Sequence, residues 1–290
     1  MTHLGPAQPW TPVRPPRPRW WTPAILAQLA VVVATLAGGI VGASVLDGRD
    51  KGTDVLSVVQ AASTSTAAQP TLHATMTMRV TGSGIEITTK ADTLIDQVRK
   101  VSTGSVTVPT LGALQIVSAN GVVYFQLPGA RTDASGHHWL SFRGPQGAAA
   151  LGEQDPLSLL KAFGDPKDVS RIGTDSIHGV QTTHYRITLD PSRLQALVAK
   201  SGTGFNVPPG VLDQLKNADL QLWIDGKHLV RRMDMALDIK QISMRMRMEL
   251  SDYGQPVEVH RPADSDVSQL ASPMQLGQVL GGIATGVHSG

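Results

Sequence analysis

Cysteine is absent from this chain of 290 residues, and aromatic residues make up only 4% of it. Without cysteine the protein cannot form a disulfide bond, a thiolate metal site or a lipid-modified cysteine anchor, so an exported domain has to be held together by packing alone. An excess of one charge is also missing, because the formal net charge is +2 and the basic residues form no runs. This argues against a nucleic-acid partner.

Motifs for catalysis and cofactor binding are absent as well. The nine histidines form no H-E-x-x-H pattern, and the sequence contains neither a G-x-S-x-G elbow nor a G-x-x-x-x-G-K loop. We interpret the pair His137-His138 as a polar turn before Trp139 rather than as a metal site. Since no cluster supplies a nucleophile, a base and an electrophile together, we expect no enzyme, no metal and no cofactor. A hydrolase would require a catalytic cluster that only the fold brings together.

A long uncharged stretch lies near the N-terminus, at residues 23–46, and its only strongly polar side chain is Gln28. At 1.5 Å per residue a helix of this length spans about 36 Å, which is enough to cross a bilayer. The preceding residues, 1–22, carry three arginines and no acid, whereas the four charges in 47–51 cancel. The positive-inside rule then predicts a single-pass plasma-membrane protein with a cytoplasmic N-terminus and an extracytoplasmic C-terminal domain.

Two further interpretations of this stretch stay open. Small residues at 42–44 offer a cleavage site, so the stretch could instead be a signal peptide that is removed after export. Gly38 and Gly42 form a G-x-x-x-G pair, a spacing that allows two such helices to pack together. The oligomeric state therefore stays open, while export of the remaining chain is expected in either case.

Composition and patterning divide the chain into four parts. Residues 1–22 are rich in proline and are expected to form a disordered cytoplasmic tail, followed by the anchor at 23–46. Residues 53–262 are expected to form the extracytoplasmic domain, and 263–290, rich in glycine and serine, a flexible C-terminal tail. Thr53 or Asp54 is expected to cap a helix that begins the domain, with its apolar face at Val55, Leu56, Val58, Val59 and Ala62.

From 72 to about 259 the hydrophobic pattern has a period of two, which predicts strands with one dry and one wet face. Asp225-Gly226 predicts a tight hairpin, because glycine tolerates positive φ, and 82–84 predicts another turn. Helices are predicted to begin at Asp155-Pro156 and at Pro191, with a short third one from Pro208 to Leu215. These elements predict an α+β fold in which a single large, curved antiparallel sheet wraps around a few helices.

Methionine gathers on the apolar side of the predicted strands. Seven of the nine methionines lie in three strand patterns, always at the apolar positions. Methionine is unbranched and polarisable, so a surface rich in it adapts to irregular apolar shapes, including alkyl chains. Either these side chains fill an ordinary core, or they line a lipid cavity. The candidate lipid-binding residues are Met76, Met78, Met233, Met235, Met244, Met246 and Met248.

Charged residues lie at the opposite, polar positions of the same strands. Asp234 and Asp238 are expected to be solvated there. A basic strip on neighbouring strands would either keep the sheet soluble or meet anionic lipid headgroups. Its residues are Arg231, Arg232, Arg245 and Arg247.

The order of several segments resembles a known family. These are DPLSLL at 155–160, VSRIG at 169–173, IHGVQTTHY at 177–185, LWIDG at 222–226 and VRR at 230–232. Together they are similar to the LppX/LprAFG-type actinobacterial envelope lipoproteins, which share the fold of the LolA and LolB lipoprotein carriers. The resemblance implies a half-barrel of about eleven strands around helices, with an apolar cavity for the acyl chains of envelope lipids. The chain departs from the family in having no cysteine, so a transmembrane helix has to replace the lipid anchor.

Two functions follow as hypotheses. The first is a membrane-anchored envelope protein that binds or transfers acylated lipids or lipoproteins through an apolar cavity. The alternative is an envelope sensor or scaffold that uses the same fold to bind a protein partner and reports through its cytoplasmic tail. Prolines between 12 and 18 would suit a polyproline-binding domain, and deleting the tail would abolish signalling only in this alternative.

Overall fold

The computed structural model describes residues 55–82, 84–109, 111–133, 135–143, 169–188, 215–239 and 242–270, together with 275 and 279. Within these residues the structure has the α-helix α2, two short 3-10 helices and twelve strands, and residues 275 and 279 are also helical. The helices are α2 (Val55–Ala67), η1 (Pro128–Ala130) and η4 (Asp264–Asp266). The strands are β1 (Thr71–Gly82), β2 (Ile85–Asp96), β3 (Val101–Val108), β4 (Gly112–Ala119), β5 (Val122–Gln126), β6 (Trp139–Arg143), β7 (Val169–Ile177), β8 (Val180–Thr188), β9 (Leu215–Asp225), β10 (Val230–Ile239), β11 (Ile242–Ser251) and β12 (Val267–Leu270).

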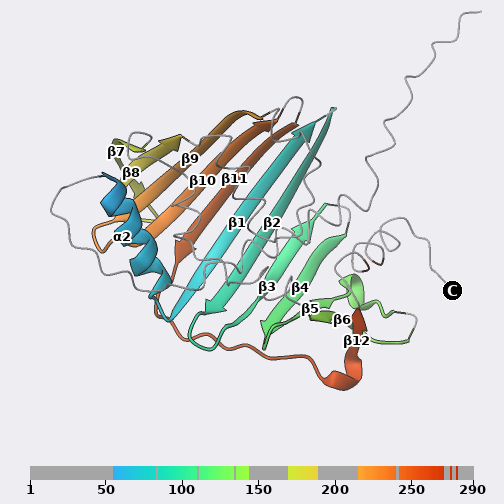
Figure 1. The fold of residues 1–290 in the computed structure, drawn as a ribbon. Helices are drawn as coiled ribbons and strands as arrows, with labels where there is room; N and C mark the ends of the chain where they lie inside the picture. Colours follow the sequence, from blue (N-terminus) through green and yellow to red (C-terminus); the bar gives the residue numbers. More distant parts are fainter. Residues whose placement is uncertain are drawn as a thin grey trace, which may run out of the picture.

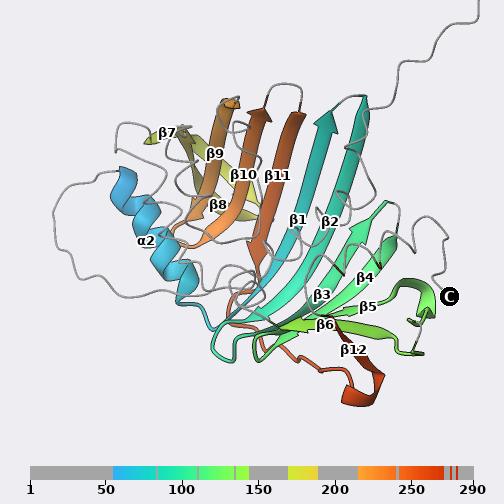
Figure 2. The same cartoon turned by 45° about the vertical axis from the view of Figure 1, so that its right-hand side comes forward.

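All twelve strands belong to one sheet, in the order β12-β6-β5-β4-β3-β2-β1-β11-β10-β9-β8-β7. Every neighbouring pair is antiparallel except β12 and β6, which are parallel. The sheet curves strongly, so that β5 and β6 run across the direction of β9, β10 and β11 (Figure 2). The predicted large, curved antiparallel sheet with few helices is therefore confirmed, with twelve strands where the resemblance implied about eleven.

The predicted helix before the sheet is confirmed as α2, which lies beside the end of the sheet formed by β7 to β10 (Figure 1). Its buried positions are Val59, Ala62, Ser63 and Thr66, at the spacing of one helix face. Val59 and Ala62 belong to a cluster with strands β8, β9 and β10. The buried face thus continues past the predicted apolar residues into two polar ones.

Other predicted helices fall outside the described residues. These are the anchor at 23–46 and the helices predicted to begin at Asp155-Pro156, Pro191 and Pro208; the predicted cytoplasmic tail at 1–22 lies outside them too. Leu215, predicted to end the third helix, instead begins strand β9. A search of the described residues finds no helix whose length and hydropathy would let it span a membrane.

Both predicted turns exist, but one has a different geometry. Gly84 has a φ of 77° in the connection between β1 and β2, as a tight turn requires. Strands β9 and β10 are joined by four residues, Gly226 to Leu229, and the positive φ of 58° falls on His228 instead of Gly226. The predicted hairpin is confirmed, and its loop has this different geometry because the Asp225 side chain organises it. Its Oδ1 accepts hydrogen bonds from the backbone N–H groups of Lys227 and Leu229, at 2.8 and 2.9 Å.

Part of the C-terminal region is ordered as a strand, although residues 263–290 were predicted to be a flexible tail. The four residues of β12 pair with β6 and close that edge of the sheet. Asp266, just before β12, accepts hydrogen bonds from the backbone N–H and the Nδ1 of His138, both at 2.8 Å. The sequence Val-Ser-Gln-Leu is too short and too polar to show a strand period, so only tertiary pairing reveals it.

A buried ion pair fixes the lower end of the sheet beside α2. Asp225, 8% exposed, accepts a hydrogen bond from Arg231, whose guanidinium also lies 5.0 Å from the ring centre of Tyr253. The Tyr253 hydroxyl donates to the Val230 carbonyl, and Thr66 of α2 accepts the Val230 N–H at 3.0 Å. Helix α2, the loop between β9 and β10, and the residues after β11 therefore meet at this cluster.

Gly104 is required where β2 and β3 pair. A Cβ added at Gly104 would lie 2.1 Å from the Asp92 carbonyl oxygen and 2.8 Å from the Thr93 Cα, both backbone atoms that a rotamer change cannot move. We therefore expect Gly104→Ala to lower the free energy of unfolding by about 3 kcal/mol. Urea unfolding measures this. Gly173→Ala is the control, because an added Cβ there meets nothing within 4 Å, and equal losses in both variants would contradict the steric argument.

The Asp225 carboxylate is expected to make the stability depend on pH. Burial alone would raise its pKa, but hydrogen bonds from Leu229, Arg231 and Lys227 outweigh burial and hold the pKa below 3.8. A carboxyl whose pKa is lowered by folding stabilises the protein fully above its unfolded pKa and loses that contribution as the pH falls through the folded value. We expect Asp225→Ala to lose about 2–4 kcal/mol at pH 7, and this difference from wild type to shrink below pH 3.8. A difference that stays constant down to pH 2 in urea unfolding would contradict this assignment.

Candidate functional site

The pleat of the central strands separates apolar from charged side chains. In β1 the residues Leu72, Ala74, Met76, Met78 and Val80 are all buried on one side, which we call the inner face. The intervening residues of β1 are polar and are partly or fully exposed on the other side, which we call the outer face. Antiparallel pairing without a slip carries this separation into β11 and β10.

All seven methionines predicted as site residues come together on the inner face of three adjacent strands, β1, β11 and β10. Strand register places them in three rows across the sheet. The rows are Met76–Met248–Met233, Met78–Met246–Met235 and Val80–Met244–Leu237. This is a single contiguous surface, the methionine block, rather than three separate stripes.

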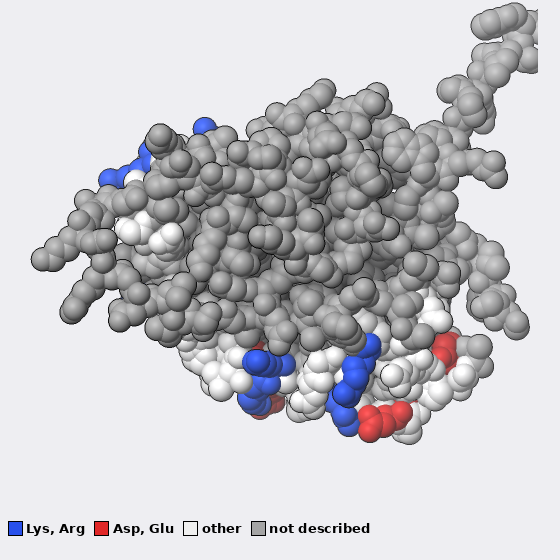
Figure 3. All heavy atoms as spheres, viewed as in Figure 1, with Lys and Arg blue, Asp and Glu red and all other residues white. Residues whose placement is uncertain are grey.

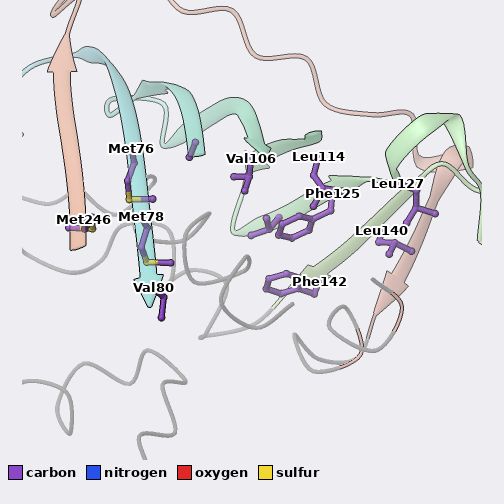
Figure 4. Packing of buried hydrophobic residues seen from close by; sticks show 12 residues of the cluster. Met76, Met78, Val80, Val106, Leu114, Phe125, Leu127, Leu140, Phe142 and Met246 are labelled. Carbon is purple, nitrogen blue, oxygen red and sulfur yellow. The ribbon is translucent and has the colours of Figure 1, made fainter. Parts of the chain in front are cut away.

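The methionine block is continuous with apolar side chains on both sides. Towards β8 it meets Leu222, Leu220, Tyr185 and Ile187. Towards β6 it continues through Ala91, Val106 and Leu114 to the rings of Phe125 and Phe142, which stack at 5.7 Å (Figure 4). One apolar face therefore extends from β8 to β6.

Burial differs within the methionine block. Met76, Met78, Met246 and Met248 are 2–5% exposed, whereas Met233, Met235 and Met244 are only partly buried. The partly buried methionines contact both the cluster around β1 and the cluster around α2. These three flexible thioether side chains thus lie between two better-packed clusters, where an added apolar group would find adaptable contacts.

The predicted basic strip is compensated by acids. Arg247 pairs with Asp234 at 2.6 Å and Arg245 with Asp238 at 2.7 Å, both on the outer face. Arg232 pairs with Glu249, and Arg231 with Asp225, so each of the four arginines has a carboxylate partner. Of the two interpretations of the basic strip, a charged face that keeps the sheet soluble agrees with these ion pairs, because alternating charges on neighbouring strands satisfy one another, whereas contact with anionic headgroups stays a prediction. On the side shown in Figure 3, basic and acidic side chains likewise lie next to one another along the lower margin.

A hollow of about 460 Å³ lies on the outer face, opposite the methionine block. Ala236 lies between Asp219 and Arg245 in the cross-strand register, so a small side chain is flanked there by long charged ones. Arg79 and Thr77 of β1 also line it. Seven of its ten lining residues are polar or charged, and Met235 and Met246 of the methionine block also contribute to its wall.

An aromatic and ionic row on the outer face was not predicted. The ring of Trp223 stacks on His184 at 4.1 Å, and the Arg232 guanidinium lies 5.4 Å from the Trp223 ring centre. Glu249 pairs with both Arg232 and His178, and the His178 Nε2 lies 2.7 Å from the Glu249 Oε2. Burial alone would raise the pKa of Glu249, but its hydrogen bonds with His178 and Arg232 outweigh burial and lower it. Strand register, which the sequence does not give, brings these residues together.

Histidine and acidic side chains are the residues from which a metal site could be built. Within the described ranges, no group of three or more His, Asp or Glu side chains is arranged to hold a metal ion. His137 and His138 lie before β6, where His137 Nδ1 is 2.9 Å from the Ser268 hydroxyl and His138 pairs with Asp266. Both side chains therefore connect the segment before β6 to the segment around β12.

Comparison with sequences gives little guidance. No family model matches the chain. The chain is 27% identical over 126 residues to an uncharacterized 31.2 kDa protein of Streptomyces griseus, encoded in the rplA-rplJ intergenic region. This match spans 42% of the chain and 41% of that relative.

Among solved structures, the chain is similar to the lipoprotein LppX of Mycobacterium tuberculosis, at 18% identity and a TM-score of 0.46, with 72% of this chain and all of that one covered. It is also similar to LprF of Mycobacterium bovis, at 19% identity and a TM-score of 0.45, covering 74% and 100%. The resemblance predicted from the sequence is confirmed in that these two family members are among its structural neighbours. The likeness concerns the fold, and the ligand has to follow from the side chains of this protein.

Opposite faces of β11 are expected to respond differently to truncation. Met246→Ala removes a side chain that is 5% exposed and packed in the core, so we expect a loss of about 2–4 kcal/mol in the free energy of unfolding. Arg245→Ala removes the neighbouring, exposed side chain of an ion pair, and we expect a loss of at most about 1 kcal/mol. Urea unfolding of both variants compares the faces, and similar losses would contradict the assignment of Met246 to the inner face.

Proposed function

We propose that this protein is a non-enzymatic, membrane-anchored lipid-binding protein of the cell envelope, whose inner face holds the acyl chains of a lipid or an acylated protein. The observation that carries the proposal is the methionine block, in which seven thioether side chains form one surface across β1, β11 and β10. An ordinary core is filled best by Leu, Ile, Val and Phe, whose rotamers are well defined. The rotamers of methionine are less well defined, so its side chain can adapt to ligands of variable shape.

Energetics support acyl chains as the ligand class. Each buried CH₂ group contributes about 0.8 kcal/mol, so ten of them contribute about 8 kcal/mol before the cost of immobilising the chain. The methionine block contributes apolar contact without a charged group, so selectivity for a headgroup has to arise elsewhere. Apolar burial of this kind requires no catalytic group, which fits a carrier or a holder better than an enzyme.

An anchor at 23–46 would limit how such a protein works. A carrier tethered by a transmembrane helix cannot diffuse away with its ligand, so it has to pass the lipid to a neighbour, present it or sense it close to the membrane. In this proposal the domain stays extracytoplasmic, within reach of the short segment that joins 46 to the start of α2.

Photoaffinity labelling tests acyl binding on the full chain. The protein in lipid nanodiscs is irradiated with a fatty acid that carries a diazirine on its alkyl chain, and labelled peptides are identified by mass spectrometry. We expect labels on inner-face residues of β1, β10 and β11, and competition by excess unlabelled palmitic acid. Labelling spread evenly over both faces, or insensitive to palmitic acid, would contradict the proposal.

Substitutions at one partly buried position refine this test. Met235→Gln keeps the length of the side chain but adds a polar amide to the inner face, so we expect at least about a tenfold loss of labelling affinity. Met235→Leu keeps the surface apolar and is expected to retain labelling. Ala236→Gln, one residue away on the outer face, is the control for polarity, and an equal loss in this variant would show that the effect does not come from the inner face.

A further inference from the structure

Two buried polar atoms of the described residues have no hydrogen-bond partner: Ser63 Oγ in α2 and Gln97 Oε1 just after β2. The two residues are only 6% and 7% exposed. Most buried polar atoms in proteins are paired, because an unpaired one loses its hydrogen bonds to water without replacement. Two such atoms in one region indicate a missing partner, either water or a ligand.

Both atoms lie at the end of the inner face where α2 meets the sheet. Gln97 Nε2 donates to the Thr66 carbonyl of α2 at 3.3 Å, and the Gln97 N–H donates to the Pro70 carbonyl at 2.8 Å. The amide is thereby held with its nitrogen towards the helix, which leaves Oε1 as a free acceptor. Ser63 lies three residues before Thr66, so the two side chains are neighbours on the same helix face.

The same region adjoins the methionine block. Ala62, next to Ser63, belongs to a cluster against which Met233, Met235 and Met244 pack. Ile95, two residues before Gln97, belongs to a cluster that contains Met248. Ser63 and Gln97 therefore adjoin two clusters that residues of the methionine block also contact.

We propose that Ser63 and Gln97 bind a hydroxyl group on the ligand, so that the preferred ligand is a lipid with a hydroxylated acyl chain. This inference rests on the proposed function. A hydroxyl is both a donor and an acceptor: its O–H pairs with Gln97 Oε1, and its oxygen accepts the Ser63 O–H. A carboxylate or an ionised phosphate offers no donor to Gln97 Oε1, and a plain alkyl chain leaves both atoms unpaired.

Discrimination is expected to be substantial, because a site with buried polar groups rejects an analogue that leaves them unpaired. The test is competition for photolabelling of the full chain in nanodiscs. Hexadecanoic acid is compared with a series of hydroxyhexadecanoic acids that differ in the position of the hydroxyl. In the wild type we expect one hydroxylated acid to compete about tenfold better than the plain acid.

Variants separate specific recognition from general partitioning into the nanodisc. We expect Ser63→Ala and Gln97→Met to lose this preference while plain hexadecanoic acid still competes. Thr64→Ala, an exposed position on the same helix whose hydroxyl bonds to the Gln60 carbonyl, is the matched control and should keep the preference. Thermal unfolding without ligand provides a second measurement: Ser63→Ala removes an unpaired buried atom, so Tm should stay equal or rise.

Each outcome decides between the explanations. If every hydroxylated acid competes like the plain acid in the wild type, or if the preference survives both substitutions, the two atoms bind buried water and the inference is overturned. A loss of Tm in Ser63→Ala would show that Ser63 has a structural partner, which also overturns it. If no acid competes at all, the proposed function fails and the inference with it, whereas competition by plain acids alone rejects only the hydroxyl site.

Discussion

Strand register is the constraint on which the rest of this structure depends. Side chains alternate between the two faces of a sheet, so a slip of one residue between β1 and β11 would move the methionines to the outer face and Arg245 and Arg247 to the inner face. Ion pairs oppose the equivalent slip between β10 and β11, because Asp234 lies directly across from Arg247, and Arg232 across from Glu249. Exposed ion pairs contribute little to stability. Their contribution here is to the choice of register, because each slipped pairing would bury a charge.

Packing differs along the inner face of the curved sheet. Near β6 the face is filled by stacked phenylalanine rings, and near β8 it is covered by α2. Between these two ends lies the methionine block, whose three partly buried members contact both clusters. Gly104 contributes to the geometry of the middle region, since β2 and β3 approach each other there more closely than any Cβ would allow. The most adaptable side chains therefore occupy the region between two rigid ends.

Sequence patterns predicted the sheet because alternation is a local signal. The alternation within a strand predicts which side chains share a face, as for Met76 and Met78, or for Met244, Met246 and Met248. All seven methionines do share one face. Features that depend on pairing were not predictable. The pairing of the four arginines with acids and the stacking of Trp223 on His184 arise only when β8 to β11 align. Strand β12 was missed because four residues without a clear period are recognised only by their partner β6.

The polar residues of α2 give the helix directional contacts in addition to its apolar packing. Had its buried face been wholly apolar, α2 would only cover the end of the sheet. Thr66 instead accepts the Val230 N–H through its side chain and the Gln97 amide through its carbonyl, so the helix is fixed by directional contacts on two sides. A helix held in this way keeps the neighbouring Ser63 in a defined position, although nothing pairs with its hydroxyl. Because burial of an unpaired hydroxyl is unfavourable, Ser63, like Gln97 Oε1, fits the proposed role of contacting a ligand that the protein itself does not supply.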